Sequence, residues 1–176
     1  MTRIIITGAN GKMGHVIRSV VAGREDCTVV AGVDFNTQSA DFPIYKTIAE
    51  VQEEADVIID FSNPALLDDL LTYSAAKSMP LVIATTGYTA EQKAKIEAAA
   101  EKCPIFFTYN MSMGINLLAT LAQKAVNVLG PDFDIEIVEK HHNQKIDAPS
   151  GTALMLADAM CKDCLLYTSP SPRDGA

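Results

Sequence analysis

A glycine-rich segment directly after a short apolar run constrains the fold of this chain more than any other feature. Residues 3–7 are rich in β-branched side chains, and Gly8, Gly11 and Gly14 follow at a spacing of three before a helical pattern begins. These glycines permit, in that order, a tight turn, close approach of a pyrophosphate, and close packing of a helix on a strand. The segment therefore predicts a strand, a turn and a helix whose free N-terminal amides can bind a phosphate group.

Apolar runs and helical patterns then alternate along the first 110 residues. Strands are expected at 3–7, 28–33, 57–61, 81–85 and 105–108, and helices at 14–21, 64–76 and 90–102. Ser62-Asn63-Pro64 and Thr89 supply helix-start signals, and Pro80 and Pro104 open strands. Apolar strands alternating with helices are typical of a parallel sheet buried on both faces. We therefore expect an α/β, Rossmann-like, doubly wound domain at residues 1–110.

The pattern changes after Asn110. A long apolar helix is expected at 112–129, ended by Gly130-Pro131, and an alternating strand with one wet face at 133–139. A polar loop at 141–149 and a helix starting near Ser150 follow. Residues 111–162 are interpreted as an incomplete α+β substrate and oligomerisation domain. Residues 163–176 lose the helical period and fill with Ser and Pro, so we expect a foreign or disordered tail there.

Charge and cysteine content limit which classes of partner the protein can bind and in which cellular compartment it is expected. The chain carries 14 basic and 22 acidic side chains, a net charge of −8, which disfavours nucleic acid and anionic membrane surfaces. The apolar run at the N-terminus is too short for a signal peptide or a membrane span, so a cytoplasmic protein is expected. Four cysteines are too sparse for a disulfide framework.

The cofactor hypothesis depends on Asp34, which lies 20 residues after Gly14 at the end of the second expected strand. At that separation an acidic side chain can accept hydrogen bonds from ribose hydroxyls. Phe35 stands where an arginine would meet a 2′-phosphate, so NADH is at least as suitable as NADPH, although Lys12 could attract that phosphate. The alternative for the glycines alone is an ordinary tight turn, and the turns at Phe61-Ser62 and at 84–87 allow the same alternative.

The densest chemistry lies in residues 139–152. His141, His142 and Lys145 can exchange protons or hold an anion, and Ser150-Gly151-Thr152 opens a helix whose free amides form an anion site. The alternatives are a solvated polar loop for the cations and an ordinary helix cap for Ser150. The crowding of cations beside an anion site, in a chain with a dinucleotide fold, favours acid-base work on an anionic substrate.

Five motifs in this chain resemble the 4-hydroxy-tetrahydrodipicolinate reductase (dihydrodipicolinate reductase) family. They are GANGKMG at 8–14, DFSNP at 60–64, ATTGY at 84–88, YNMSMGIN at 109–116 and EKHHNQKIDAPSGTAL at 139–154. They occur in the family's order from Met1 to about Met160, and the last motif is highly specific. The resemblance implies an NADH- or NADPH-dependent oxidoreductase of lysine and diaminopimelate biosynthesis.

The resemblance also implies roles for individual residues. His141 would be the general acid/base and Lys145 the proton donor, and the substrate carboxylates would be held by His142, Ser150, Gly151 and Thr152. The cofactor would be lined by Gly8, Ala9, Asn10, Gly11, Lys12, Met13, Asp34, Ala84, Thr85, Thr86, Thr108, Tyr109, Asn110 and Met111. Hydride would pass from the nicotinamide to C4 of the cyclic imine after loss of its hydroxyl, and the enamine would then be protonated to give tetrahydrodipicolinate.

The chain departs from the family at its C-terminus, where further strands and a segment returning to the nucleotide domain are expected. We therefore expect this chain to bind dinucleotide but to reduce the dicarboxylate substrate poorly, and the family's homotetramer is in doubt for it. One rival interpretation is a dinucleotide-binding sensor or fragment without turnover. Another is structural zinc held by Cys161, Cys164, His141 and His142, which we disfavour because the histidines have a better role, so no metal is expected.

Overall fold

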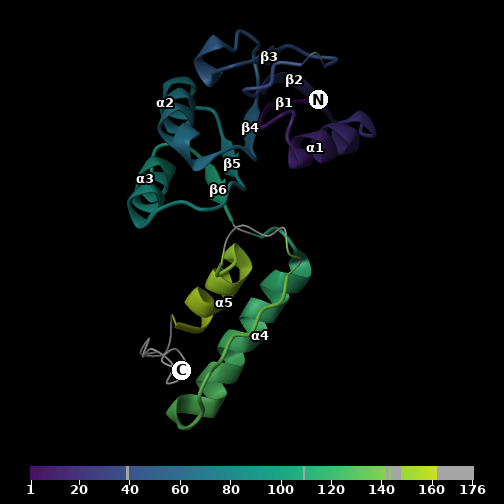
Figure 1. Ribbon diagram of the computed structural model, residues 1–176. Coiled ribbons are helices and arrows are strands. Elements are labelled where there is room, and N and C mark those ends of the chain that lie inside the picture. Colours follow the sequence, from purple (N-terminus) through teal and green to yellow (C-terminus); the bar gives the residue numbers. More distant parts are fainter. Residues whose placement is uncertain (39, 109, 142, 144–147, 162–176) are drawn as a thin grey trace. The chain divides into compact units, whose positions relative to one another are not determined.

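The computed structural model describes residues 1–38, 40–108, 110–141, 143 and 148–161. It divides the chain into two compact units, Met1–Tyr109 and Asn110–Ala176 (Figure 1). The domain boundary expected after residue 110 lies one residue from this division. The expected tail, 163–176, lies outside the described residues.

The first unit is a parallel sheet with helices between its strands. Its elements are β1 (Thr2–Thr7), α1 (Lys12–Ala22), β2 (Cys27–Val33), β3 (Ile44–Tyr45), η1 (Ile48–Glu50), β4 (Val57–Asp60), η2 (Pro64–Leu66), α2 (Leu67–Lys77), β5 (Leu81–Ile83), α3 (Ala90–Ala100) and β6 (Ile105–Phe107). The strand order is β3-β2-β1-β4-β5-β6, with every pairing parallel. The Rossmann-like prediction is confirmed, and β3 is a two-residue strand that the sequence pattern did not reveal.

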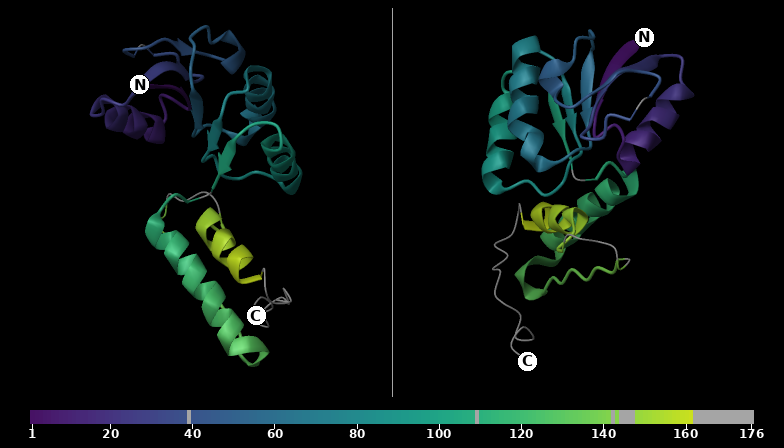
Figure 2. Two further views of the ribbon diagram at one scale, coloured as in Figure 1. Left: turned by 180° about the vertical axis from the view of Figure 1, so that it is seen from behind. Right: turned by 45° about the horizontal axis from the view of Figure 1, so that its top comes forward.

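The sheet is covered on both faces, with α1 on one side and α2 and α3 on the other (Figure 2). Strand β1 shows why both faces need cover, because the side chains of a strand point alternately to the two faces of the sheet. Ile4 and Ile6 pack with Val21 of α1, whereas Ile5 packs with Leu67 and other residues of the α2 and α3 layer. A strand whose side chains are apolar on both faces can bury them all only inside a sheet that is covered by helices on both sides.

Local sequence explains where the helices of the first unit begin. The Asn63 side chain accepts a hydrogen bond from the Ala65 amide at 2.9 Å, at the start of η2. Thr89 and Gln92 form a capping box at α3, with the Thr89 hydroxyl accepting from the Gln92 amide at 3.2 Å. Both helix starts that the sequence predicted are confirmed.

The second unit contains α4 (Met113–Leu129), η3 (Gly130–Asp132) and α5 (Gly151–Cys161). The strand predicted at 133–139 is wrong, because residues 134–139 adopt no regular structure. A strand needs a neighbour for its backbone hydrogen bonds. In the described part of the chain no strand follows β6, so the alternating pattern at 133–139 has nothing to pair with.

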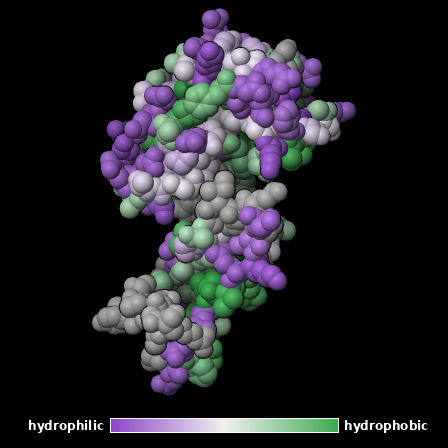
Figure 3. All heavy atoms as spheres, viewed as in Figure 1, coloured by the Kyte–Doolittle hydropathy of each residue, from purple (hydrophilic) through white to green (hydrophobic). Residues whose placement is uncertain are grey.

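The second unit also exposes apolar side chains (Figure 3). Leu117, Leu118 and Leu121 of α4 are 60%, 49% and 53% exposed, and Leu154 of α5 is 44% exposed. Of the described elements, α4 packs mainly against α5, and part of the apolar surface of both helices is left uncovered. Among the described residues, no helix combines the length and the apolarity needed to cross a membrane.

Candidate functional site

The glycine-rich turn after β1 has no room for a side chain at Gly8 or at Gly14. Gly8 has a φ of +75°, and a Cβ there would lie 2.3 Å from the Phe61 carbonyl oxygen. A Cβ on Gly14 would lie 2.2 Å from the Gly8 carbonyl oxygen. Helix α1 begins after Gly11 without a side-chain cap, so its first amides are not capped by a protein side chain. This backbone cradle fits a dinucleotide pyrophosphate.

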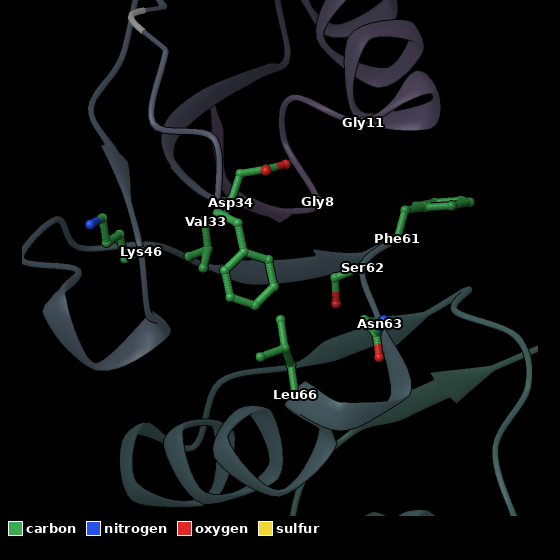
Figure 4. Close-up of a pocket in the computed structure, with 10 residues that line it drawn as sticks. Gly8, Gly11, Val33, Asp34, Lys46, Phe61, Ser62, Asn63 and Leu66 are labelled. Atoms are coloured by element: carbon green, nitrogen blue, oxygen red, sulfur yellow. The ribbon is translucent and has the colours of Figure 1, made fainter.

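A cavity of about 230 Å³ opens beside this turn (Figure 4). Gly8, Asp34 and Ser62 face it from the carboxyl ends of β1, β2 and β4. The complete lining is Gly8, Gly11, Val33, Asp34, Phe35, Lys46, Phe61, Ser62, Asn63 and Leu66. The strand order reverses between β1 and β4, where open α/β sheets bind their ligands.

Asp34 ties the glycine turn to the loop after β2. Its Oδ2 accepts a hydrogen bond from the Asn10 amide, and its Oδ1 accepts one from the Asn36 amide, each at 2.9 Å. Every carboxylate oxygen has two lone pairs, so each can still accept a ribose hydroxyl. Asp34 is therefore held by the backbone in a fixed position at the pocket wall.

Asn10 extends this junction through its side chain. Its Nδ2 donates to the carbonyl oxygens of Asn36 at 2.6 Å and Gln38 at 3.2 Å, and its Oδ1 accepts from Arg18 at 3.0 Å. The Arg18 guanidinium also lies over the Phe42 ring, 5.1 Å from the centroid. Asn10 thus organises the loop that would border the ribose, and its side chain is committed to protein partners.

The other residues expected around the cofactor differ in their exposure. The Ala9 side chain is fully buried, so only its backbone can meet a ligand, whereas Lys12 and Met13 are exposed at the start of α1. Thr85 is 5% exposed, and its hydroxyl accepts a hydrogen bond from the Ser62 amide at 2.8 Å. Thr86 is exposed, and Ala84 and Thr108 continue β5 and β6 through backbone hydrogen bonds.

Tyr109 lies outside the described residues, and Asn110 and Met111 belong to the second unit. Asn110 Nδ2 donates to the Thr152 hydroxyl at 2.9 Å, and Asn110 Oδ1 accepts from the Ser112 amide at 2.8 Å. Asn110 therefore links the start of α4 to the first turn of α5. This bond brings a residue expected at the cofactor together with one expected at the substrate.

Glu139 joins His141 to the N-terminus of α5. Its Oε2 lies 2.7 Å from His141 Nε2, and its Oε1 accepts a hydrogen bond from the Ser150 amide at 2.8 Å. The Ser150 hydroxyl in turn accepts from the Ala153 amide at 3.1 Å and caps the helix. Gly151 is the first residue of the helix. A carboxylate that contacts an imidazole ring nitrogen can orient the ring for proton transfer.

The pKa of Glu139 predicts how this contact responds to acid. Hydrogen bonds from Ser150, followed by that from His141, lower the pKa of Glu139 from 4.5 to about 2. A carboxyl group whose pKa is depressed by folding stabilises the folded state above its unfolded pKa, and this contribution is lost as the pH falls from 4.5 towards 2. In NMR spectra the Ser150 amide signal should hold steady down to the unfolded pKa and shift only below it. A midpoint at the unfolded value would contradict the contact, and Glu139→Gln should remove the transition.

His142 and Lys145, expected in substrate binding and proton donation, lie outside the described residues. The same holds for Cys164, so the structure does not describe the rival zinc set as a whole. Cys161 is exposed at the end of α5. Among the described residues, no group of three or more His, Cys, Asp or Glu side chains could hold a metal ion.

Several residues of the site were not singled out from the sequence as site residues. Asp60 is fully buried at the end of β4, Tyr88 is 6% exposed and bonded to it, and Lys46 lines the pocket from the loop after β3. The fourth such residue is Glu139, which contacts His141. The available signals were an acidic residue ending an apolar strand, for Asp60, and an acidic residue two positions before a histidine, for Glu139.

Comparison with known proteins agrees with this geometry. The family model described as dihydrodipicolinate reductase, N-terminus, matches residues 2–111, and the one described as dihydrodipicolinate reductase, C-terminus, matches residues 114–173. The second match extends past residue 163, where we expected an unrelated tail to begin.

Two curated relatives are named 4-hydroxy-tetrahydrodipicolinate reductase. The one from Caldanaerobacter subterraneus subsp. tengcongensis is 52% identical over 160 residues, and the one from Clostridium tetani is 47% identical over 161 residues. Each alignment covers 91% of this chain and 63% of the relative. The chain therefore spans less than two thirds of the length of these relatives.

Two solved structures are also similar. Dipicolinate-bound dihydrodipicolinate reductase from Paenisporosarcina sp. TG-14 aligns with a TM-score of 0.74 and 28% identity, covering 98% of this chain and 70% of that one. A myo-inositol dehydrogenase from Corynebacterium glutamicum aligns with a TM-score of 0.52 and 20% identity, covering 72% of this chain and 42% of that one, and shows a shared fold alone. Because the family models together match nearly the whole chain, this protein belongs to the dihydrodipicolinate reductase family.

Proposed function

We propose that this chain carries the cofactor site and catalytic segment of an enzyme that reduces 4-hydroxy-tetrahydrodipicolinate to tetrahydrodipicolinate with NADH or NADPH. The family match supports the reaction. The observation that carries the proposal for the cofactor is the cavity where the uncapped α1 N-terminus, the glycine turn and Asp34 meet. When bound, the nicotinamide supplies the hydride that reduces the substrate.

The residues of the first unit bind and orient the dinucleotide. The amides of Gly8, Ala9, Asn10 and Gly11 already donate to protein acceptors, so the first amides of α1, at Lys12 and Met13, hold the pyrophosphate beside the glycine turn. Asp34 accepts ribose hydroxyls. A free 2′-hydroxyl can donate to Asp34, whereas a 2′-phosphate would meet its negative charge. Lys46, which lines the same pocket, is a cation that could offset this repulsion. We therefore propose that both cofactors are accepted and that Asp34 favours NADH.

The residues of the second unit handle the substrate and its protons. The N-terminus of α5, with Gly151 and Thr152 in its first turn, holds a carboxylate of the small-molecule substrate. His141 acts as the general acid/base, with Glu139 against its Nε2, and Lys145 donates the proton to the carbon that gains electron density. His142 contributes to carboxylate binding. The neighbour from Paenisporosarcina, which is dipicolinate-bound, supports a dicarboxylate as the substrate class.

We extend the proposal to the cellular setting. The enzyme would act in lysine and diaminopimelate biosynthesis in the cytoplasm, and a chain of full family length would form a homotetramer. The test is oxidation of NADH or NADPH with and without 4-hydroxy-tetrahydrodipicolinate, by this chain and by one extended to the length of its relatives. Substrate-dependent oxidation by the extended chain supports the reductase. Dinucleotide binding without it favours a non-catalytic dinucleotide-binding fragment.

Asp34→Ala should weaken NADH binding by roughly tenfold and NADPH binding by less, because only NADH presents a hydroxyl donor at the 2′ position. The measurement is a fluorescence titration of each dinucleotide with the 176-residue chain. Asp41→Ala removes an exposed carboxylate from the same loop and serves as the control. Equal losses for both cofactors would show that Asp34 does not contact the 2′ position.

A further inference from the structure

Asp60 is a buried carboxylate at the end of β4 with four hydrogen-bond donors around it. Its side chain is fully buried. It accepts from the Thr7 hydroxyl at 2.5 Å, from the Ser62 hydroxyl at 2.5 Å and amide at 3.2 Å, and from the Tyr88 hydroxyl at 3.3 Å. In the part of the chain that the structure describes, no Lys, Arg or His forms an ion pair with Asp60. Within the described ranges, it is hydrogen bonds that offset the cost of burying it.

These donors come from three different strand ends at the crevice. Thr7 ends β1 and directly precedes Gly8, Ser62 follows β4, and Tyr88 lies between β5 and α3. Burial and, after it, the Asp60 carboxylate raise the pKa of Tyr88, so its phenol keeps the proton that it donates. Since Gly8 and Ser62 both line the pocket, Asp60 joins the segments that form its wall.

The network also determines which way hydrogen bonds run at Ser62. The Ser62 hydroxyl has one proton, which it donates in a hydrogen bond to Asp60. The Ser62 amide proton is shared between Asp60 and the Thr85 hydroxyl oxygen, at 3.2 and 2.8 Å. Ser62 therefore has no proton left for a ligand, but its hydroxyl oxygen keeps lone pairs at the pocket wall. A phosphate oxygen needs a hydrogen-bond donor and cannot bond to Ser62. A ribose hydroxyl or an amide N–H can donate a hydrogen bond to the Ser62 hydroxyl oxygen.

We propose that Asp60 is a positioning residue that holds Ser62 as a hydrogen-bond acceptor, so that Ser62 receives a hydroxyl or amide proton of the bound dinucleotide and does not contact its phosphates. This inference rests on the proposed dinucleotide function and deepens it. The phosphates bind the first α1 amides beside the glycine turn, so the two parts of the pocket recognise different groups of the ligand. Asp60 itself touches no ligand, because it is fully buried.

The first experiment separates positioning from stability. Thr7→Val keeps the shape of a fully buried side chain and removes one donor to Asp60, and Asp60→Asn removes the charge. The control is Ser74→Ala, which removes an equally buried hydroxyl that bonds the Met79 carbonyl oxygen at 2.7 Å, between α2 and β5. NADH affinity is titrated well below each variant's Tm.

Thr7→Val should weaken NADH binding by roughly 3- to 10-fold, and Asp60→Asn by more. Ser74→Ala should lower Tm with an unchanged Kd. If Asp60→Asn does not fold, Thr7→Val alone decides the question. Unchanged NADH affinity in Thr7→Val, or an equal loss in Ser74→Ala, overturns the positioning role. If the parent chain binds no NADH, it is the proposed function that fails, and this inference fails with it.

The second experiment tests the polarity of Ser62. Inorganic pyrophosphate, which has no ribose or amide, is used to compete with NADH. Ser62→Ala should weaken NADH binding by roughly 3- to 10-fold and leave the inhibition constant of pyrophosphate unchanged. A parallel loss of NADH and pyrophosphate affinity would show that Ser62 faces a phosphate and would overturn its acceptor role.

Discussion

Gly14→Ala is expected to weaken NADH binding by roughly 100-fold, because overpacking against backbone forces the turn itself to move. The added Cβ would lie 2.2 Å from the Gly8 carbonyl oxygen and 2.5 Å from that of Ala9. Neither atom can swing aside as the end of a flexible side chain could. The turn leads directly into the α1 amides proposed to bind the pyrophosphate, so the shift acts directly on affinity. Fluorescence titration of NADH measures the loss.

Gly23→Ala is the matched control for this prediction. Gly23 ends the same helix, but a Cβ there would meet its nearest neighbour, the Val20 carbonyl oxygen, at 3.6 Å, an ordinary contact. It should bind NADH like the parent chain. Circular dichroism on both variants shows whether the fold persists. Parental affinity in Gly14→Ala would mean that the glycine turn is not the pyrophosphate site.

His141→Ala and Lys145→Ala should each lower kcat by about 100-fold or more in a chain extended to the length of its relatives, with dinucleotide affinity nearly unchanged. Both residues are proposed to move protons during the reaction and not to bind the cofactor. Thr152→Ala should mainly raise the substrate KM, since its proposed task is to hold a carboxylate. Steady-state kinetics and a separate NADH titration distinguish these effects.

His15→Ala and Lys140→Ala are the controls, because they remove an exposed histidine from α1 and an exposed lysine beside His141. Both should keep parental kcat. Wild-type turnover by Lys145→Ala would remove it from the proton-donor role. A loss in Lys140→Ala as large as that in Lys145→Ala would point to a general charge effect of the loop.

The alternation of strands and helices in the first unit was predictable because it depends on local pattern. Apolar runs, the helix starts at Asn63 and Thr89, and the glycine turn each act over a few residues. The two-residue strand β3 was not, because Ile44–Tyr45 is too short to show a period and forms only by pairing with β2. The same dependence on a neighbour explains why the alternating segment 133–139 is not a strand.

The residues of the site also fall into those that local sequence indicates and those that depend on tertiary contacts. The sequence by itself indicated the glycine turn and the acidic residue 20 positions after Gly14, since both are a matter of residue type and spacing, and the cluster of His141, His142 and Lys145 stays a prediction from the sequence. Only the tertiary structure decided which polar groups are already committed to one another. Asp60 meets Thr7 and Tyr88 because parallel strands bring distant residues to one edge of the sheet, and burial there removes the water that would otherwise satisfy them.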